Sequence, residues 1–190
     1  MAIEFYFDFA SPYGFIAAMK IDTLALPVTW RPFLLGAVYK QFGQSPLEHP
    51  LKREYVIGVD APRMARLIGL DLRVPADFPE HALPPARTFY WLEAQDPAKA
   101  VAFAKAAYRQ YWLEGRRTSD RSVALDVAVT LGFDRDAVIA GMQAPATKDR
   151  LIRENGDAIG KGVFGSPFFL VDNEPFWGSD RLDLICPPLR

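Results

Sequence analysis

The sequence has little of what several common chemistries require. Its 190 residues include one cysteine, Cys186, and two histidines, His49 and His81. One cysteine cannot form an internal disulfide or a thiolate metal cluster, and the two histidines lack the spacing of metal ligands. We therefore expect no metal site. Any thiol chemistry must use a thiol that comes from outside the chain.

Charge of one sign and long hydrophobic runs are also missing. The formal net charge is -1, which gives no basic footprint for a nucleic acid. No apolar run reaches the roughly 18–20 residues that span a bilayer. The segment Met1–Phe9 has no basic region, and Glu4 and Asp8 interrupt its apolar residues, so we expect no signal peptide. These features predict a cytoplasmic protein with no nucleic-acid or membrane partner.

The first part of the chain has the pattern of a β-α-β unit. Half of the residues are hydrophobic, enough for a packed core. Apolar side chains alternate over residues 3–9, which predicts a strand. Ser11 and Pro12 then favour the start of a helix over residues 12–24. Residues 28–33 form a second predicted strand, and a helix between two strands favours parallel pairing.

The middle of the chain is predicted to be helical. Residues 34–86 are irregular and rich in proline, with short helices expected at 51–57 and 61–70. From residue 86 to residue 159 the pattern is helical, and individual helices are expected to begin at Pro97, after Ser119 or Asp120, after Asp134 and near Pro145.

The end of the chain returns to strands. Residues 168–171 and 175–177 are predicted to form a hairpin, followed by a helix that begins near Gly178. We therefore expect an α/β fold in which a β-α-β unit and a β-β-α unit share one sheet. The predicted domains are residues 1–36 with 160–190, and an inserted helical domain over residues 37–159.

Three short segments carry candidate chemistry, and each has a simpler structural reading. Ser11 lies at a predicted helix N-terminus, where unpaired N–H groups favour anions, thiolates included, but a serine there is also an ordinary helix cap. Ser166-Pro167 precedes a strand, and an X-Pro bond is most often trans. Ser179 and Asp180 either cap the last helix or bind a carboxylate and an ammonium group.

The order of three motifs adds a family resemblance. The run from Phe5 to Tyr13, FYFDFASPY, resembles the opening of 2-hydroxychromene-2-carboxylate isomerases and of kappa-class glutathione transferases. GVFGSPFF at residues 162–169 and FWGSDRL at residues 176–182 resemble later motifs of the same families. The resemblance covers essentially the whole chain, and it implies a thioredoxin-like domain interrupted by a helical domain.

The resemblance also implies a glutathione site. Ser11 is expected to bind the sulfur of glutathione and favour its thiolate. Ser166, before a cis Pro167, is expected to pair with the cysteinyl part through its backbone. Ser179 and Asp180 are expected to hold the γ-glutamyl end.

Further contacts are predicted around that site. The resemblance implies that Lys52 meets the glycyl carboxylate of glutathione. Tyr13 is a candidate contact for an aromatic substrate, and Arg87 or another cation is a candidate partner for its carboxylate. Core packing or surface solvation is the alternative role of both residues. Ser11-Pro12-Tyr13-Gly14 stands where redox relatives carry Cys-x-x-Cys, so dithiol exchange is unavailable to this chain.

The leading functional hypothesis is a glutathione-dependent isomerase that converts 2-hydroxychromene-2-carboxylate into trans-o-hydroxybenzylidenepyruvate through transient addition of the thiolate. One alternative is a transferase that conjugates glutathione to electrophiles. Another is a non-catalytic glutathione- or peptide-binding module. The resemblance further implies a homodimer.

Overall fold

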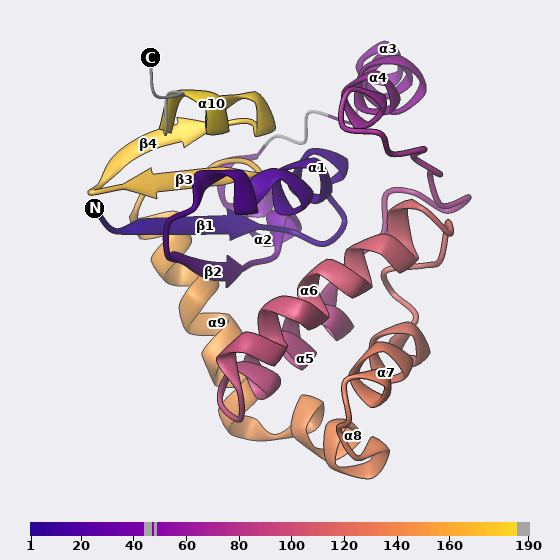
Figure 1. The fold of residues 1–190 in the computed structure, drawn as a ribbon, viewed down its shortest axis with the longest axis vertical. Helices are drawn as coiled ribbons and strands as arrows, with labels where there is room; N and C mark the ends of the chain where they lie inside the picture. The colour runs from indigo at the N-terminus through magenta and orange to yellow at the C-terminus, as the bar shows by residue number, and fades with distance from the viewer. Residues whose placement is uncertain (44–46, 48, 186–190) are drawn as a thin grey trace.

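The computed structural model describes residues 1–43, 47 and 49–185, so Cys186 lies outside the described residues. The described residues form a four-stranded sheet. Figure 1 shows this sheet at one end of the molecule and a group of helices at the other. The strands are β1 (Ile3–Phe7), β2 (Val28–Pro32), β3 (Phe168–Val171) and β4 (Glu174–Trp177). The two ends of the chain therefore contribute to one sheet, as the sequence predicts.

The sheet has the strand order β2-β1-β3-β4. The central strand β1 pairs in parallel with β2, where Phe5 lies opposite Trp30, and antiparallel with β3, where Phe5 lies opposite Phe169. β3 and β4 form the antiparallel hairpin. The parallel β-α-β unit and the closing hairpin are both confirmed, although β1 ends at Phe7, two residues before the predicted strand does.

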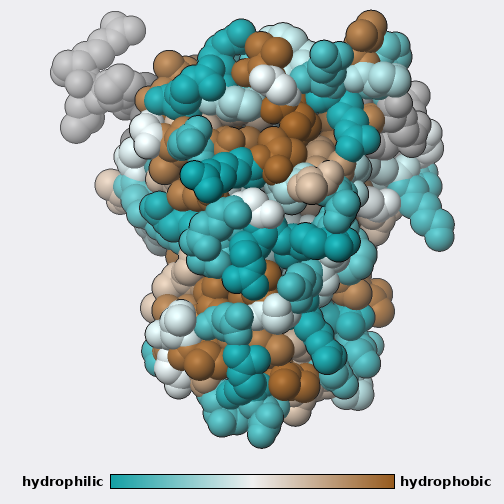
Figure 2. Space-filling view, turned by 90° about the vertical axis from the view of Figure 1, so that its right-hand side faces the viewer, coloured by the Kyte–Doolittle hydropathy of each residue, from teal (hydrophilic) through white to brown (hydrophobic). Residues whose placement is uncertain are grey.

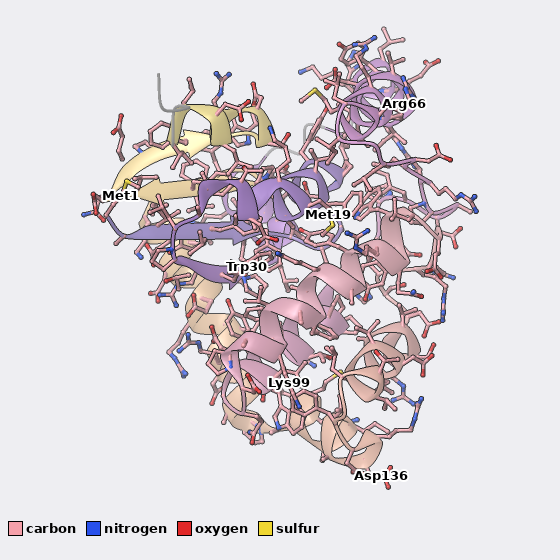
Figure 3. All side chains as sticks on the ribbon, viewed as in Figure 1. Met1, Met19, Trp30, Arg66, Lys99 and Asp136 are labelled. Carbon is pink, nitrogen blue, oxygen red and sulfur yellow. The ribbon has the colours of Figure 1, made fainter. Side chains whose placement is uncertain are left out.

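The alternation in β1 separates two layers of core. Ile3, Phe5, Phe7 and Phe9 lie in the larger core, whereas Tyr6 lies in a smaller core on the other face. Helix α1 (Pro12–Lys20) and the short 3-10 turn η1 (Ile21–Leu24) follow β1, and α1 packs against α6 (Pro97–Trp112). Trp30 extends from β2 on this side (Figure 3). The Lys105 ammonium of α6 lies 5.8 Å from the Trp30 ring centroid.

The opposite face of the sheet is covered by α2 (Leu35–Phe42) and the end of α9 (Pro145–Gly160). Ala158 and Val163 pack there against Tyr6 and Phe168. The sequence reading missed α2, because it begins without a polar cap at Leu34 and lies in a segment interpreted as irregular. Because α9 reaches this face, its C-terminal turns, the last of the helical region, pack against the sheet. The domain division itself stays a prediction.

The remaining helices form the lower part of Figure 1 and a projecting arm. The lower helices are α5 (Leu83–Glu93), α6, α7 (Arg121–Thr130) and α8 (Arg135–Gln143). Asp96, Asp120 and Asp134 cap α6, α7 and α8 through their carboxylates.

We call the projecting part the arm. It consists of α3 (Pro50–Glu54), the π-helical segment η2 (Tyr55–Asp60) and α4 (Ala61–Arg66). Arg66 marks its tip in Figure 3, at the opposite end of the molecule from Asp136. The two short helices predicted at 51–57 and 61–70 correspond to this arm. The closing helix corresponds to the 3-10 turn η3 (Ser179–Arg181) and α10 (Leu182–Ile185).

Candidate active site

Ser11 caps helix α1 and also reaches a second loop. Its backbone is extended, with φ -97° and ψ 119°, and its Oγ accepts a hydrogen bond from the Gly14 N–H at 3.0 Å. The same hydroxyl donates to the carbonyl oxygen of Ser166 at 2.9 Å. Ser11 is 6% exposed. The capping interpretation is therefore confirmed, and the hydroxyl additionally joins the helix to the loop before β3.

Ser166 and Pro167 are joined by a cis peptide bond, as the resemblance implies. The Ser166 Oγ accepts the N–H of Asp8 at 2.9 Å. Among the described residues, no protein group accepts the N–H of Ser166 itself. An unpaired backbone donor and a neighbouring carbonyl suit the backbone of a bound peptide.

Gly14 explains why the two loops can approach so closely. A Cβ at this position would lie 2.7 Å from the Tyr108 hydroxyl oxygen and 2.9 Å from the Ser166 Oγ. The Tyr108 hydroxyl in turn donates to the carbonyl oxygen of Asp8 at 2.8 Å. Any larger residue at position 14 would therefore require the Tyr108 or Ser166 side chain to shift.

Asp8 is a site residue that the sequence reading did not single out. Its side chain is buried, and its two carboxylate oxygens accept the N–H groups of Ala10 and Leu35 at 2.8 and 2.7 Å. Burial raises the pKa of this carboxyl to about 6, although the two N–H donors and the charge of His81 act in the opposite direction. The signal in the sequence was an acidic residue between Phe7 and Phe9, at the end of the first predicted strand.

Ser179 and Asp180 lie beyond β4, at the start of η3. Gly178 has a φ of 121°, and its N–H donates to the carbonyl oxygen of Pro167 at 3.2 Å, which brings this turn to the cis-proline loop. Ser179 is buried, and in the part of the chain that the structure describes its hydroxyl has no hydrogen-bond partner. Asp180 forms an ion pair with Arg181 at 3.4 Å and does not cap the turn.

Tyr13 connects α1 to the arm. Its hydroxyl donates to the Asp60 carboxylate at 2.6 Å, and the Asp60 carboxylate also accepts from the Tyr55 hydroxyl at 3.3 Å. Burial and the Asp60 carboxylate raise the pKa of Tyr13, so its hydroxyl stays protonated at neutral pH. Tyr13 therefore contributes a neutral ring to the site and holds the arm beside it.

These groups surround one cavity of about 1110 Å³. Its wall includes Ser11, Tyr13, one face of α2, the inner side of the arm, the cis-proline loop and the start of η3, together with the segment Phe78–Glu80. The structure thus brings together six of the predicted residues: Ser11, Tyr13, Ser166, Pro167, Ser179 and Asp180. The space-filling view shows apolar side chains gathered in the upper half of one face, framed by hydrophilic ones (Figure 2).

Two predicted residues do not line this cavity. Lys52 is exposed on α3. Arg87 is half-buried on α5, where its Nε has no hydrogen-bond partner within the described residues. The basic residues that the described structure places on the cavity wall are Lys40 and Arg181. The roles assigned to Lys52 and Arg87 stay predictions without support from their position.

Neither metal chemistry nor a membrane span is indicated by the described residues. Within residues 1–43, 47 and 49–185, no three histidine, cysteine, aspartate or glutamate side chains cluster as metal ligands would. Over the same residues, no helix has the length and hydropathy required to cross a bilayer.

The parallel β-α-β unit, the closing hairpin and the capped helix facing a cis proline define a thioredoxin-like fold. The chain belongs to the family of DSBA-like thioredoxin domains, whose family model matches residues 2–186, and within it to the 2-hydroxychromene-2-carboxylate isomerases and their relatives.

Individual relatives match along nearly the whole chain. A 2-hydroxychromene-2-carboxylate isomerase of Sphingobium xenophagum is 31% identical, covering 96% of this chain and 95% of that protein. A glutathione S-transferase kappa 1 of Caenorhabditis elegans is 28% identical, covering 99% and 90%. A solved structure of a 2-hydroxychromene-2-carboxylate isomerase superposes with a TM-score of 0.88 at 29% identity, covering 97% of this chain and 92% of that one.

Proposed function

We propose that the chain is a glutathione-dependent isomerase that interconverts 2-hydroxychromene-2-carboxylate and trans-o-hydroxybenzylidenepyruvate. The observation that carries the proposal is the position of Ser11. Its hydroxyl lies on the cavity wall at the N-terminus of α1, within hydrogen-bond distance of the cis-proline loop. One relative is named a 2-hydroxychromene-2-carboxylate isomerase and another a glutathione S-transferase. These names support an isomerase reaction and the use of glutathione.

The donor groups of the cavity fit glutathione. The unpaired N–H of Ser166 suits the amide backbone of a tripeptide, and the Ser179 hydroxyl has no partner among the described residues. Asp180 adds a carboxylate that suits the free ammonium group of the γ-glutamyl end. The cavity volume of about 1110 Å³ exceeds the range of about 300–1,000 Å³ that is usual for one small ligand, so it has room for glutathione beside a second molecule.

The chain's own task is to hold a thiolate and orient the substrate. Bound glutathione supplies a thiolate that adds reversibly to the conjugated carbon–carbon double bond and is regenerated. The Ser11 hydroxyl donates to Ser166 in this structure. In the proposed complex its hydrogen turns about the Cβ–Oγ bond toward the sulfur, and the oxygen keeps the N–H of Gly14. Donation to the charged sulfur lowers the thiol pKa, and the positive end of the α1 dipole acts in the same direction.

Tyr13 and the arm complete the enclosure. With the Tyr13 hydroxyl bound to Asp60, the arm covers one side of the cavity with apolar groups such as Val56 and Met64. These groups suit an aromatic substrate and limit the entry of water to the reacting carbons. The proposal retains the expectations of a homodimer and a cytoplasmic location.

A transferase is the second candidate, because a kappa-class transferase is 28% identical over nearly the whole chain. A transferase also begins with addition of the thiolate but releases the adduct. A non-catalytic binding module, the third reading, predicts glutathione binding without turnover.

The experiment is turnover of 2-hydroxychromene-2-carboxylate with and without glutathione, in which product and free thiol are both followed. Isomerisation that depends on glutathione and consumes no thiol is the expected result. Loss of thiol in step with product assigns the transferase instead. Glutathione binding without turnover of this substrate or of simple electrophiles assigns the binding module.

A further inference from the structure

Tyr39 carries a hydroxyl group on the cavity wall that the fold itself does not use. The residue is half-buried on α2 and lines the cavity, whereas the opposite side of the helix packs on the sheet through Val38. Among the described residues, no group forms a hydrogen bond with the Tyr39 hydroxyl. A phenol group can donate one hydrogen bond, so this donor is available to a ligand.

The other hydroxyl groups of the cavity wall are already engaged or assigned. Tyr13 donates to the arm at 2.6 Å, and Ser11 donates to the carbonyl oxygen of Ser166 at 2.9 Å. The Ser166 Oγ accepts a backbone N–H at 2.9 Å. Ser179 lies at the proposed γ-glutamyl end of the glutathione site. Of the hydroxyl groups on the described wall, that of Tyr39 is therefore the one left for the substrate.

Hydrogen bonds fix the start of α2, and with it Tyr39, relative to Ser11. The side chains of a helix lean toward its N-terminus, so Tyr39 extends over the turn that begins at Leu35. The Leu35 N–H donates to the Asp8 carboxylate at 2.7 Å. The carbonyl oxygen of Asp8 accepts the Ser11 N–H at 2.9 Å. The Tyr39 side chain thus lies at the end of α2 that is tied to the segment carrying Ser11.

Tyr39 is a neutral donor at physiological pH. Burial and, secondly, the charge of Asp8 raise its pKa to about 12, so the hydroxyl keeps its proton. A fixed donor on the wall of a cavity that excludes water stabilises negative charge that develops nearby more strongly than water does. The Tyr39 hydroxyl is therefore suited to an oxygen atom that becomes negatively charged during a reaction.

The proposed reaction creates such an oxygen at a distance from the sulfur. Addition of the thiolate to the benzylic carbon of trans-o-hydroxybenzylidenepyruvate forms a carbon–sulfur bond and moves the electron pair of the conjugated double bond toward the ketone oxygen. The former double bond is then single and can rotate. Departure of the thiolate breaks the carbon–sulfur bond and returns the electron pair from the oxygen, so these two steps consume no proton and no electron.

We propose that the Tyr39 hydroxyl is a catalytic hydrogen-bond donor to the ketone oxygen of the substrate, where it stabilises the negative charge that follows addition of the thiolate. The identity of the substrate rests on the proposed function. Ser11 stabilises the charge while it is on the sulfur, and Tyr39 stabilises it while it is on the oxygen. The Tyr39 hydroxyl keeps its proton throughout, so it lowers the barrier to addition and departure without changing the balance of either step.

The first test is the steady-state kinetics of Tyr39→Phe, which removes one oxygen atom and keeps the ring. Loss of one donor to a developing oxyanion lowers kcat about 10²–10³-fold, so we expect kcat for the chromene to fall about 10²-fold while KM changes less than about threefold. Tyr111→Phe is the matched control. Tyr111 also carries a hydroxyl without a partner among the described residues, but it lies on α6 and does not line the cavity.

The second test needs no turnover and no glutathione. The probe is trans-benzylidenepyruvate, which has the conjugated ketone of the substrate but lacks the phenol and therefore cannot close the chromene ring. Its ultraviolet absorption is recorded when it is bound to each protein. A hydrogen bond to the ketone oxygen moves the absorption maximum to longer wavelength. The maximum should therefore lie at longer wavelength in the wild type and in Tyr111→Phe than in Tyr39→Phe.

The outcomes separate the role of Tyr39 from the proposed function. Conversion of the chromene with the same kcat in Tyr39→Phe and the wild type supports the reaction and overturns the donor. The donor is also overturned if the wild type does not bind the probe, if the bound probe has the same absorption maximum in all three proteins, or if Tyr39→Phe raises the thiol pKa of bound glutathione, which would place the hydroxyl at the sulfur. A spectral shift that depends on Tyr39, in a protein that does not convert the chromene, supports the donor and contradicts the proposed reaction.

Discussion

The Ser11 hydroxyl donates a hydrogen bond of 2.9 Å to the carbonyl oxygen of Ser166, a residue 155 positions later in the chain. This bond joins the N-terminus of α1 to the cis-proline loop. The loop returns a second bond, because the Ser166 Oγ accepts the N–H of Asp8 at 2.9 Å. The two segments that carry the candidate site are therefore held against each other by reciprocal bonds.

Replacement of Ser166 by alanine should destabilise the fold. The variant leaves the buried N–H of Asp8 without an acceptor, which costs about 1–3 kcal/mol. The free energy of unfolding in urea measures the loss. Thr23→Ala removes an exposed hydroxyl that bonds only the Lys20 carbonyl oxygen, and it should change stability by less than about 0.5 kcal/mol. Equal midpoints for Ser166→Ala and the wild type would contradict this account of the loop.

Gly14→Ala and Gly156→Ala should have opposite effects on stability. A Cβ at Gly14 would lie 2.7 Å from the Tyr108 hydroxyl oxygen, which must shift, so we expect a loss of about 1–3 kcal/mol. A Cβ at Gly156 meets nothing within 4 Å, so the helix gains about 0.5–1 kcal/mol. Thermal unfolding of both variants is the measurement. A Gly14→Ala protein as stable as the Gly156→Ala protein would show that the loops can move apart freely.

The sequence predicted the strands and the helix that position the site better than it predicted the residues that line the cavity. Ile3 to Phe9 alternate strictly, and Ser11-Pro12 is a strong helix start, so β1 and α1 followed from local rules. The parallel pairing of β1 with β2 and the hairpin of β3 with β4 followed from the β-α-β and hairpin patterns, whereas the strand order of the sheet was not predicted. The cis bond before Pro167 came from the family resemblance alone, because local sequence cannot select it.

The missed features depend on contacts between distant segments. The N-terminus of helix α2 is held by a buried aspartate that lies 27 residues earlier in the chain. The Leu35 N–H donates to the Asp8 carboxylate, and the residue before the helix provides no side-chain cap. The Tyr108 hydroxyl donates to the carbonyl oxygen of Asp8, which lies 100 residues earlier in the chain. Arg87 was expected to meet a substrate carboxylate because of its charge, but α5 carries it away from the cavity wall. None of these relationships has a local sequence signal.

Asp8 should give the stability of the fold a distinct dependence on pH. Burial raises its pKa from 3.8 to about 6, so the folded state holds the proton more tightly than the unfolded state. The contribution of this group is fully present below pH 3.8 and is lost as the pH rises through about 6. Asp8→Asn removes the titration. Relative to that variant, the wild type should lose about 2 kcal/mol of unfolding free energy between pH 4 and pH 7.

The test is urea unfolding of the wild type and of Asp8→Asn at both pH values. Because each comparison is made within one pH, the titration of all other groups cancels to first order. A difference between the two proteins that does not change with pH would show that Asp8 is ionised in the fold throughout this range.

Asp180 should contribute to glutathione affinity and little to stability. Its carboxylate is exposed, pairs with Arg181 at 3.4 Å and caps no helix. We expect Asp180→Asn to raise the Kd of glutathione about tenfold, as loss of one charge-assisted contact does, with an unchanged melting temperature. Calorimetric titration and thermal unfolding are the two measurements. Unaltered affinity would remove Asp180 from the glutathione site.

The central claim is that Ser11 favours the thiolate of bound glutathione. The most direct measurement is the ultraviolet absorbance of the thiolate as a function of pH, for glutathione bound to the wild type and to Ser11→Ala. The account predicts a pKa of the bound thiol below that of free glutathione in the wild type, and a pKa higher by about one unit or more in Ser11→Ala. Equal thiol pKa values in the two proteins, with glutathione bound to both, would contradict the role of Ser11.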